Sequence, residues 1–297
     1  AIEQLQAEKR LYEVEGKYAL DYFYYTEKQL ALRLLLLKEE NGQHTQYLHH
    51  IDNYIRQCEE RFGISYDTHQ KEAMIKAFAD AVFLITGGPG TGKTTIIRAV
   101  LEIFMLLEKT TGISDEQIEK KIALLAPTGR AAQRMQDATH FSAKTIHSFL
   151  GWDKHKNSYR FNENNAISNV EFVIVDEASM IDIWLMNALL KALPNLRHII
   201  IVGDMNQLPS VSTGQFFSDS LQSNAFATLT LEKIFRQKEN STIIDVAAAM
   251  NAGLEADIYF QQSADYSFLE LRPQQLLQAL EKICQNALNK GYDANQI

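Results

Sequence analysis

The sequence predicts an α/β fold built on a parallel β-sheet that helices cover on both faces. Short apolar runs alternate with helix-forming stretches from about residue 64 onward, and each run ends in small or polar residues. The runs are VFLIT (82–86), IALLAP (122–127), FVIVDE (172–177) and HIIIVGD (198–204). Near-continuous apolar strands separated by helices are typical of parallel sheets buried on both faces. The polar residues after these strands are then expected to meet at the carboxyl edge of the sheet, where such folds bind ligands.

The first strand runs directly into a phosphate-binding loop. GGPGTGKTT (87–95) fits G-x-x-x-x-G-K-[ST], in which glycines let backbone N–H groups curl around phosphates. The helix predicted from Thr94 to about Lys109 directs its positive end to the same place. Lys93 is expected to bind the β- and γ-phosphates, and the Thr94 hydroxyl to bind Mg²⁺. The expected nucleotide-contacting residues of this loop are Gly87, Gly88, Pro89, Gly90, Thr91, Gly92, Lys93, Thr94 and Thr95.

Two carboxylates follow the third apolar strand. Asp176 is expected to hold Mg²⁺, because this small hard cation prefers oxygen ligands. Glu177 is then placed to orient and deprotonate an attacking water. A nucleotide switch needs only the aspartate, so the adjacent glutamate favours hydrolysis.

Three further side chains are candidates for the same nucleotide. Gln207 follows the fourth strand in GDMNQLP, where its amide can sense the γ-phosphate. Arg236 in LEKIFRQ is predicted to stabilise negative charge in the transition state, because a guanidinium stays charged and donates two parallel hydrogen bonds. Gln70 precedes the first strand, where its amide can read the adenine edge, and Tyr66 can pack nearby.

Composition excludes several classes of protein. The 297 residues carry a net charge of −8, which argues against a wholly basic nucleic-acid-binding surface but allows a local basic groove. From its apolar runs and its first ten residues, we expect neither a membrane span nor a secretory signal. Its two cysteines, Cys58 and Cys284, form no metal motif and are expected to be buried or half-buried free thiols in a reducing cytoplasm. The chain does not begin with Met, so we expect a processed chain or a piece of a longer one.

Three regions are expected along the chain. Residues 1–63 are predicted to be a self-contained, mostly helical region, and residues 64–237 the P-loop lobe. Helical patterns return in 238–297. Within the lobe, 109–121 is predicted to form a surface loop with a short helix, and 151–169 a polar insertion containing a hairpin.

In this order, the motifs resemble those of the RecD-like helicases of superfamily one. The resemblance covers more than half of the chain, from Gln70 in the Q motif to Gln237. Within it, LLAPTGRAAQRM (124–135) is similar to motif Ia, KTIHSFLG (144–151) to the Ib-like segment and VIVDEASMID (173–182) to motif II. GDMNQLPSV (203–211) resembles motif III, with Ser210 where many relatives have proline, and LEKIFRQ resembles motif IV.

The resemblance implies a RecA-like lobe of an ATP-driven motor that moves 5′ to 3′ on single-stranded DNA. It implies ATP and Mg²⁺ as ligands and a role in double-strand break repair and recombination, as a RecD-type subunit with RecB- and RecC-type partners or as a stand-alone relative. In these relatives motif Ia and the Ib-like segment line the DNA channel. The DNA contacts carried over by the resemblance are Pro127, Thr128, Gly129, Arg130, Thr145 and His147. A helix N-cap is an alternative role for Thr145, and a packed histidine for His147.

The family's motifs V and VI have no match in this sequence. We therefore expect 238–297 to be the helical start of a truncated second lobe, and this chain alone to bind nucleotide but hydrolyse it poorly and unwind no DNA. Residues 1–63 either dock onto partner subunits or cap the lobe. Two other functions stay open: a P-loop ATPase of another class, such as a kinase or an assembly switch, and a scaffold with a vestigial site.

Overall fold

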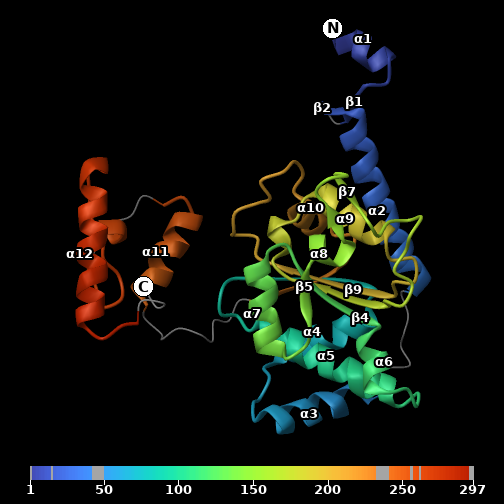
Figure 1. The fold of residues 1–297 in the computed structure, drawn as a ribbon, viewed down its shortest axis with the longest axis horizontal. Coiled ribbons are helices and arrows are strands. Elements are labelled where there is room, and N and C mark those ends of the chain that lie inside the picture. Colours follow the sequence, from blue (N-terminus) through green and yellow to red (C-terminus); the bar gives the residue numbers. More distant parts are fainter. Residues whose placement is uncertain are drawn as a thin grey trace. The chain divides into compact units, whose positions relative to one another are not determined.

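The computed structural model describes residues 2–14, 16–41, 50–231, 241–254, 257–260 and 262–293. The chain divides into two compact units, Ala1–Arg236 and Gln237–Ile297. The first unit contains the sheet and the helices around it (Figure 1).

The central sheet has six strands in the order β10-β3-β9-β8-β4-β5, and every pairing is parallel. This confirms the predicted parallel sheet and adds two edge strands to the four expected ones. The strands are β3 (Val82–Gly87), β4 (Ile122–Ala126), β5 (Ala143–Thr145), β8 (Phe172–Val175), β9 (His198–Gly203) and β10 (Ala227–Leu231).

The sheet is buried on both faces because its side chains alternate between two apolar cores. In β3, Phe83 and Ile85 belong to one core, whereas Val82 and Leu84 belong to the other. Such alternation requires apolar residues at every position, which explains the continuous apolar runs in the sequence.

Helices cover each core, as Figure 1 shows. The first core is covered by α3 (Ile51–Phe62), α4 (Thr68–Ala79), α5 (Lys93–Lys109), α6 (Asp115–Glu119) and α7 (Gly129–Thr139). The second is covered by α2 (Asp21–Asn41), α8 (Ile146–Leu150), α9 (Ile183–Lys191) and α10 (Phe216–Gln222).

The amino-terminal region contributes to both cores. It begins with α1 (Ile2–Ala7) and a hairpin of β1 (Leu11–Val14) and β2 (Lys17–Leu20). On α2, Leu30, Leu34 and Leu37 are buried in the second core, and on α3, Ile55 and Cys58 are buried in the first. Residues 1–63 are therefore part of the first unit, which corrects the expectation of a self-contained region, because the buried leucines and isoleucines of α2 and α3 fill the cores of the sheet.

The two predicted insertions have the expected form. Residues 109–121 contain the short helix α6, whose N-cap Ser114 forms a capping box with Gln117. The polar insertion contains an antiparallel hairpin of β6 (Trp152–Asp153) and β7 (Ser158–Tyr159). A three-residue 3₁₀ helix, η2 (Ala178–Met180), follows β8.

The second unit is helical in its described parts. It contains α11 (Thr242–Asn251), η3 (Asp257–Phe260), η4 (Pro273–Gln275) and α12 (Leu276–Asn289). Cys284 on α12 is half-buried and, like Cys58 in the first unit, is a free thiol, as predicted. No helix in the described segments is both long and apolar enough to cross a membrane.

Candidate nucleotide-binding site

The phosphate-binding loop joins β3 to α5 through a backbone that requires glycine. Gly90 and Gly92 have φ values of 79° and 89°, in the left-handed region that side chains with a Cβ disfavour. The Thr91 hydroxyl donates to the Gly88 carbonyl over 2.9 Å and braces the turn. α5 begins at Lys93, directly after the loop, so its amino-terminal N–H groups lie at the phosphate position expected from the sequence.

Lys93 lies inside the loop with its ammonium group already bonded. Its Nζ donates to the carbonyl oxygens of Gly87 over 2.5 Å and Gly88 over 2.8 Å. Burial lowers the pKa of Lys93, while nearby Asp204, Asp176 and Glu177 act in the opposite direction. The positive charge is thus held by carboxylates from neighbouring strands.

Asp176 and Glu177 lie directly after β8, as predicted. Burial raises the pKa of Asp176 to about 6, helped by the charge of Glu177 and opposed by Lys93 and by the Glu177 N–H. That N–H donates to Asp176 Oδ1 over 2.8 Å. Glu177 itself has φ 53° and ψ 39°, a left-handed conformation that costs a residue with a Cβ free energy. Strain of this kind is often found at functional sites.

Gln207 lies in the loop after β9, beside the buried Asp204. Asp204 Oδ1 accepts from the Asn206 N–H over 2.9 Å, and the Asp204 carbonyl accepts from the Gln207 N–H over 3.3 Å. These bonds close a turn directly after β9. Because β9 lies between β3 and β8, the loop follows the strand between those carrying Lys93 and Asp176.

These strand ends open onto one cleft of about 830 Å³. Nine of the predicted nucleotide-site residues line it: Pro89, Gly90, Gly92, Lys93, Thr94, Thr95, Asp176, Glu177 and Gln207. Gly87, Gly88 and Thr91 do not line the cleft but shape the loop that does. Thr94 and Asp176 supply hydroxyl and carboxylate oxygens in the same cleft, which fits the donor set that Mg²⁺ prefers.

Gln70 has a structural role of its own. Its Oε1 accepts from the Asp67 N–H over 3.1 Å, while Asp67 Oδ1 accepts from the Gln70 N–H over 2.8 Å. This capping box fixes the start of α4. The side-chain amide N–H groups are not part of that exchange, so an adenine contact stays a prediction for Gln70. The hydroxyl of Tyr66 is buried and has no hydrogen-bond partner among the described residues.

The candidate DNA contacts come together at the carboxyl ends of two adjacent strands. Ala126 at the end of β4 pairs with Thr145 at the end of β5, so the residues that follow both strands lie side by side. Thr128 caps α7 and Thr145 caps α8, each accepting an N–H through its side-chain oxygen. Each hydroxyl keeps its own hydrogen to donate.

The remaining candidates on this edge differ in exposure. Gly129 and Arg130 are exposed on the first turn of α7, and Pro127 is half-buried before it. His147 packs against Trp152 and Tyr159, with ring centroids 6.1 and 5.9 Å away, so the alternative of a packed histidine agrees with the structure, although its ring stays exposed. Arg236 lies outside the described residues.

Sequence reasoning missed two charged residues of the cleft. Arg134 and Asp137 on α7 line it together with the phosphate-binding loop. Both lie within a helix and not directly after a strand, so no motif in the sequence links them to the nucleotide.

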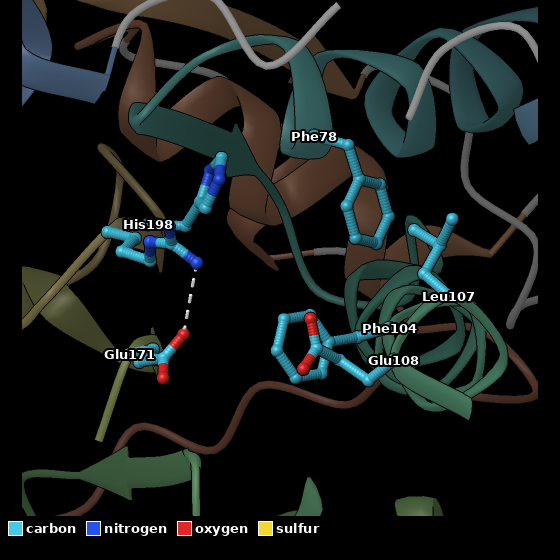
Figure 2. Close-up of a pocket in the computed structure, with 7 residues that line it drawn as sticks. Phe78, Phe104, Leu107, Glu108, Glu171 and His198 are labelled. Carbon is cyan, nitrogen blue, oxygen red and sulfur yellow. Dashed lines mark hydrogen bonds and ion pairs between the residues drawn. The ribbon is translucent and has the colours of Figure 1, made fainter. Parts of the chain in front are cut away.

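A much smaller cavity, of about 20 Å³, lies at the amino-terminal ends of the strands (Figure 2). Its lining combines apolar rings with Glu108, Glu171, Arg197 and His198. Arg197 pairs with Glu171 over 3.3 Å, as the dashed line in Figure 2 shows. The cavity has room for about one water molecule, and the phosphate-binding loop is at the other end of the strands.

Known proteins resemble the chain over the same motifs. Residues 70–213 match the family model of the AAA domain. The RecBCD enzyme subunit RecD of Buchnera aphidicola subsp. Schizaphis graminum is 38% identical over 162 residues, which cover 48% of this chain and 25% of that protein. The ATP-dependent RecD2 DNA helicase of Deinococcus radiodurans is 34% identical over 170 residues, covering 57% of this chain and 22% of that protein.

A solved structure supports the fold. The crystal structure of Pif1 helicase from Candida albicans superposes with a TM-score of 0.50 at 20% identity, covering 78% of this chain and 56% of that chain. The chain therefore spans about a quarter of the curated relatives above and about half of this structural neighbour. The ordered motifs, the parallel sheet and these relatives together show a P-loop NTPase domain that is similar in sequence to RecD and RecD2 helicases.

Proposed function

We propose that this chain carries the nucleotide-hydrolysing lobe of an ATP-dependent DNA helicase that moves 5′ to 3′ on single-stranded DNA. The observation that carries the proposal is the convergence of Lys93, Asp176, Glu177 and Gln207 on one cleft. The strands that end beside this cleft are followed in the sheet by β4 and β5, whose ends carry the candidate DNA contacts. Nucleotide and DNA would then bind at neighbouring parts of one sheet edge.

The proposed chemistry is hydrolysis of the γ-phosphate. Glu177 accepts a proton from water, whose oxygen bonds to the γ-phosphorus as the bond to the β–γ bridging oxygen breaks, giving ADP and phosphate. Lys93 and the loop N–H groups neutralise phosphate charge, and Gln207 senses the terminal phosphate. When bound, Mg²⁺ would be held by Thr94 and Asp176 and would withdraw charge from the β- and γ-oxygens.

Groups outside the cleft have proposed roles as well. Arg236 supplies a second cation to the transition state, and Gln70 reads adenine. Thr128, Thr145 and Arg130 hold DNA phosphates through hydroxyl and guanidinium hydrogen bonds. The lobe that carries these groups would end at about residue 237, where the second unit begins.

We also propose a biological setting, which the names of the relatives support in part. We place the protein in the cytoplasm, in double-strand break repair, either with RecB- and RecC-type subunits or alone. The RecD relative is named as a RecBCD subunit and the RecD2 relative as a DNA helicase, and these names support the two settings.

Phosphate release tests the proposal, measured with and without an oligo-dT strand. The assay is run on this chain and on a protein that also carries a second motor lobe. We expect single-stranded DNA to stimulate turnover in the two-lobe protein, and Glu177→Gln to abolish turnover while nucleotide still binds. Equal, DNA-independent turnover in both proteins would instead favour a P-loop ATPase of another class.

A further inference from the structure

A second cation lines the nucleotide cleft besides the lysine of the loop. Among the described residues that line it, two side chains are cationic, Lys93 and Arg134, and three are carboxylates, Asp137, Asp176 and Glu177. A Mg²⁺-bound triphosphate is itself an anion. Without Arg134, this lining would oppose three carboxylates with one ammonium group, a poor environment for phosphates.

Arg134 has a guanidinium that is available to a ligand. It makes no hydrogen bond or ion pair with any residue in the described part of the chain, and its side chain is exposed. Asp137, one turn further along α7, is already bonded within the helix, because its Oδ1 accepts a hydrogen bond from Gln133 Nε2 over 2.7 Å. Lys93, in contrast, already donates two bonds to the loop.

The helix that carries Arg134 is fixed in place. Thr128 caps its first turn, and Ala132 and Met135 are buried in the first core at 5% and 1% exposure. Arg134 therefore extends from a rigid helix wall rather than from a mobile loop. A guanidinium in such a position suits phosphate oxygens, because its planar donors can bind two of them at once.

We propose that Arg134 is a phosphate-binding residue of the nucleotide site, contributed by the same lobe as the phosphate-binding loop. This inference rests on the proposed function and adds to it a contact from α7. It separates two arginines on one helix: Arg130 at the amino-terminal turn, on the DNA edge, and Arg134 on the nucleotide cleft.

The test is equilibrium binding of fluorescent ADP and of a fluorescent non-hydrolysable ATP analogue, with Mg²⁺ and without DNA. We expect Arg134→Gln to weaken binding about tenfold, as for loss of one charge-assisted hydrogen bond. Arg134→Lys should restore part of the affinity, because it keeps the charge but not the fork. Lys282→Gln, which removes an exposed cation on α12, is the charge-matched control and should leave the affinity unchanged.

Comparing the binding of the two nucleotides shows which phosphate Arg134 contacts. Weaker binding of the ATP analogue alone places Arg134 at the terminal phosphate, and weaker binding of both nucleotides places it at the inner phosphates. Equal affinity of wild type and Arg134→Gln for both nucleotides would overturn the inference, as would weaker binding of an oligo-dT strand with nucleotide affinity unchanged.

Lys93→Ala distinguishes a failure of this inference from a failure of the proposed function. If wild type binds nucleotide and Lys93→Ala does not, the cleft is the nucleotide site whatever Arg134 does. If wild type binds neither nucleotide, the proposed function and the inference both fail.

Discussion

Glu177 has a left-handed backbone conformation, and we predict that a glutamate in this conformation lowers the stability of the first unit. A residue with a Cβ in this conformation costs about 1–2 kcal/mol, and glycine avoids that cost. Glycine also lowers the free energy of unfolding by about 0.5–1 kcal/mol, because it gives the unfolded chain more backbone freedom. We therefore expect Glu177→Gly to stabilise the first unit by roughly 0.5–1 kcal/mol while abolishing hydrolysis.

Urea unfolding followed by tryptophan fluorescence measures this effect. Both tryptophans of the chain, Trp152 and Trp184, lie in the first unit, so the signal reports that unit. With a slope of about 3 kcal/mol/M, a gain of about 1 kcal/mol moves the midpoint up by about 0.3 M. Glu177→Gln is the matched control, because it removes the same charge and keeps the strained backbone. A midpoint for Glu177→Gly at or below that of Glu177→Gln would refute the reasoning.

Three further predictions concern the folded core, a helix cap and a buried carboxylate. Leu34→Ala should cost about 2–5 kcal/mol by the same urea assay, because Leu34 is 2% exposed in the second core; a loss below 1 kcal/mol would mean that α2 does not belong to that core. Asp67→Ala should cost about 1 kcal/mol by removing the cap that Asp67 shares with Gln70, whereas Asp67→Asn should cost less. Asp176 has a folded pKa of about 6, above its ordinary 3.8, so the folded state retains its proton longer and stability falls as pH rises from about 4 to 6. Asp176→Asn should therefore be more stable than wild type at pH 8 and lose this advantage toward pH 4, and a difference that does not vary with pH would contradict the burial argument.

The strands that carry the phosphate chemistry could be predicted from the sequence, because each is a continuous apolar run ending in polar residues. The edge strands could not. β5 is only three residues long, and β10 reads ATLTL, whose alternating threonines are typical of a strand that is less buried than the central ones. Their pairing partners are distant in sequence and are fixed by the rest of the sheet.

Residues of the cleft could be predicted from the sequence wherever a motif links a residue type to a position. Lys93, Asp176 and Gln207 each follow a strand, so their meeting at one edge follows from the parallel topology. Arg134 lies in mid-helix, and only the packing of α7 beside the phosphate-binding loop brings it to the cleft. The role of α2 and α3 in the two cores was missed for a similar reason, since apolar periodicity shows that a face is buried but not against what.

Binding of a fluorescent non-hydrolysable ATP analogue, with Mg²⁺, to wild type and to Lys93→Ala tests the central claim most directly. We predict that wild type binds and that the substitution weakens binding by about 10- to 100-fold, with the urea midpoint of the first unit little changed. Equal binding by the two proteins would contradict the claim that the cleft around Lys93 binds nucleotide, because the nucleotide would then occupy some other part of the molecule.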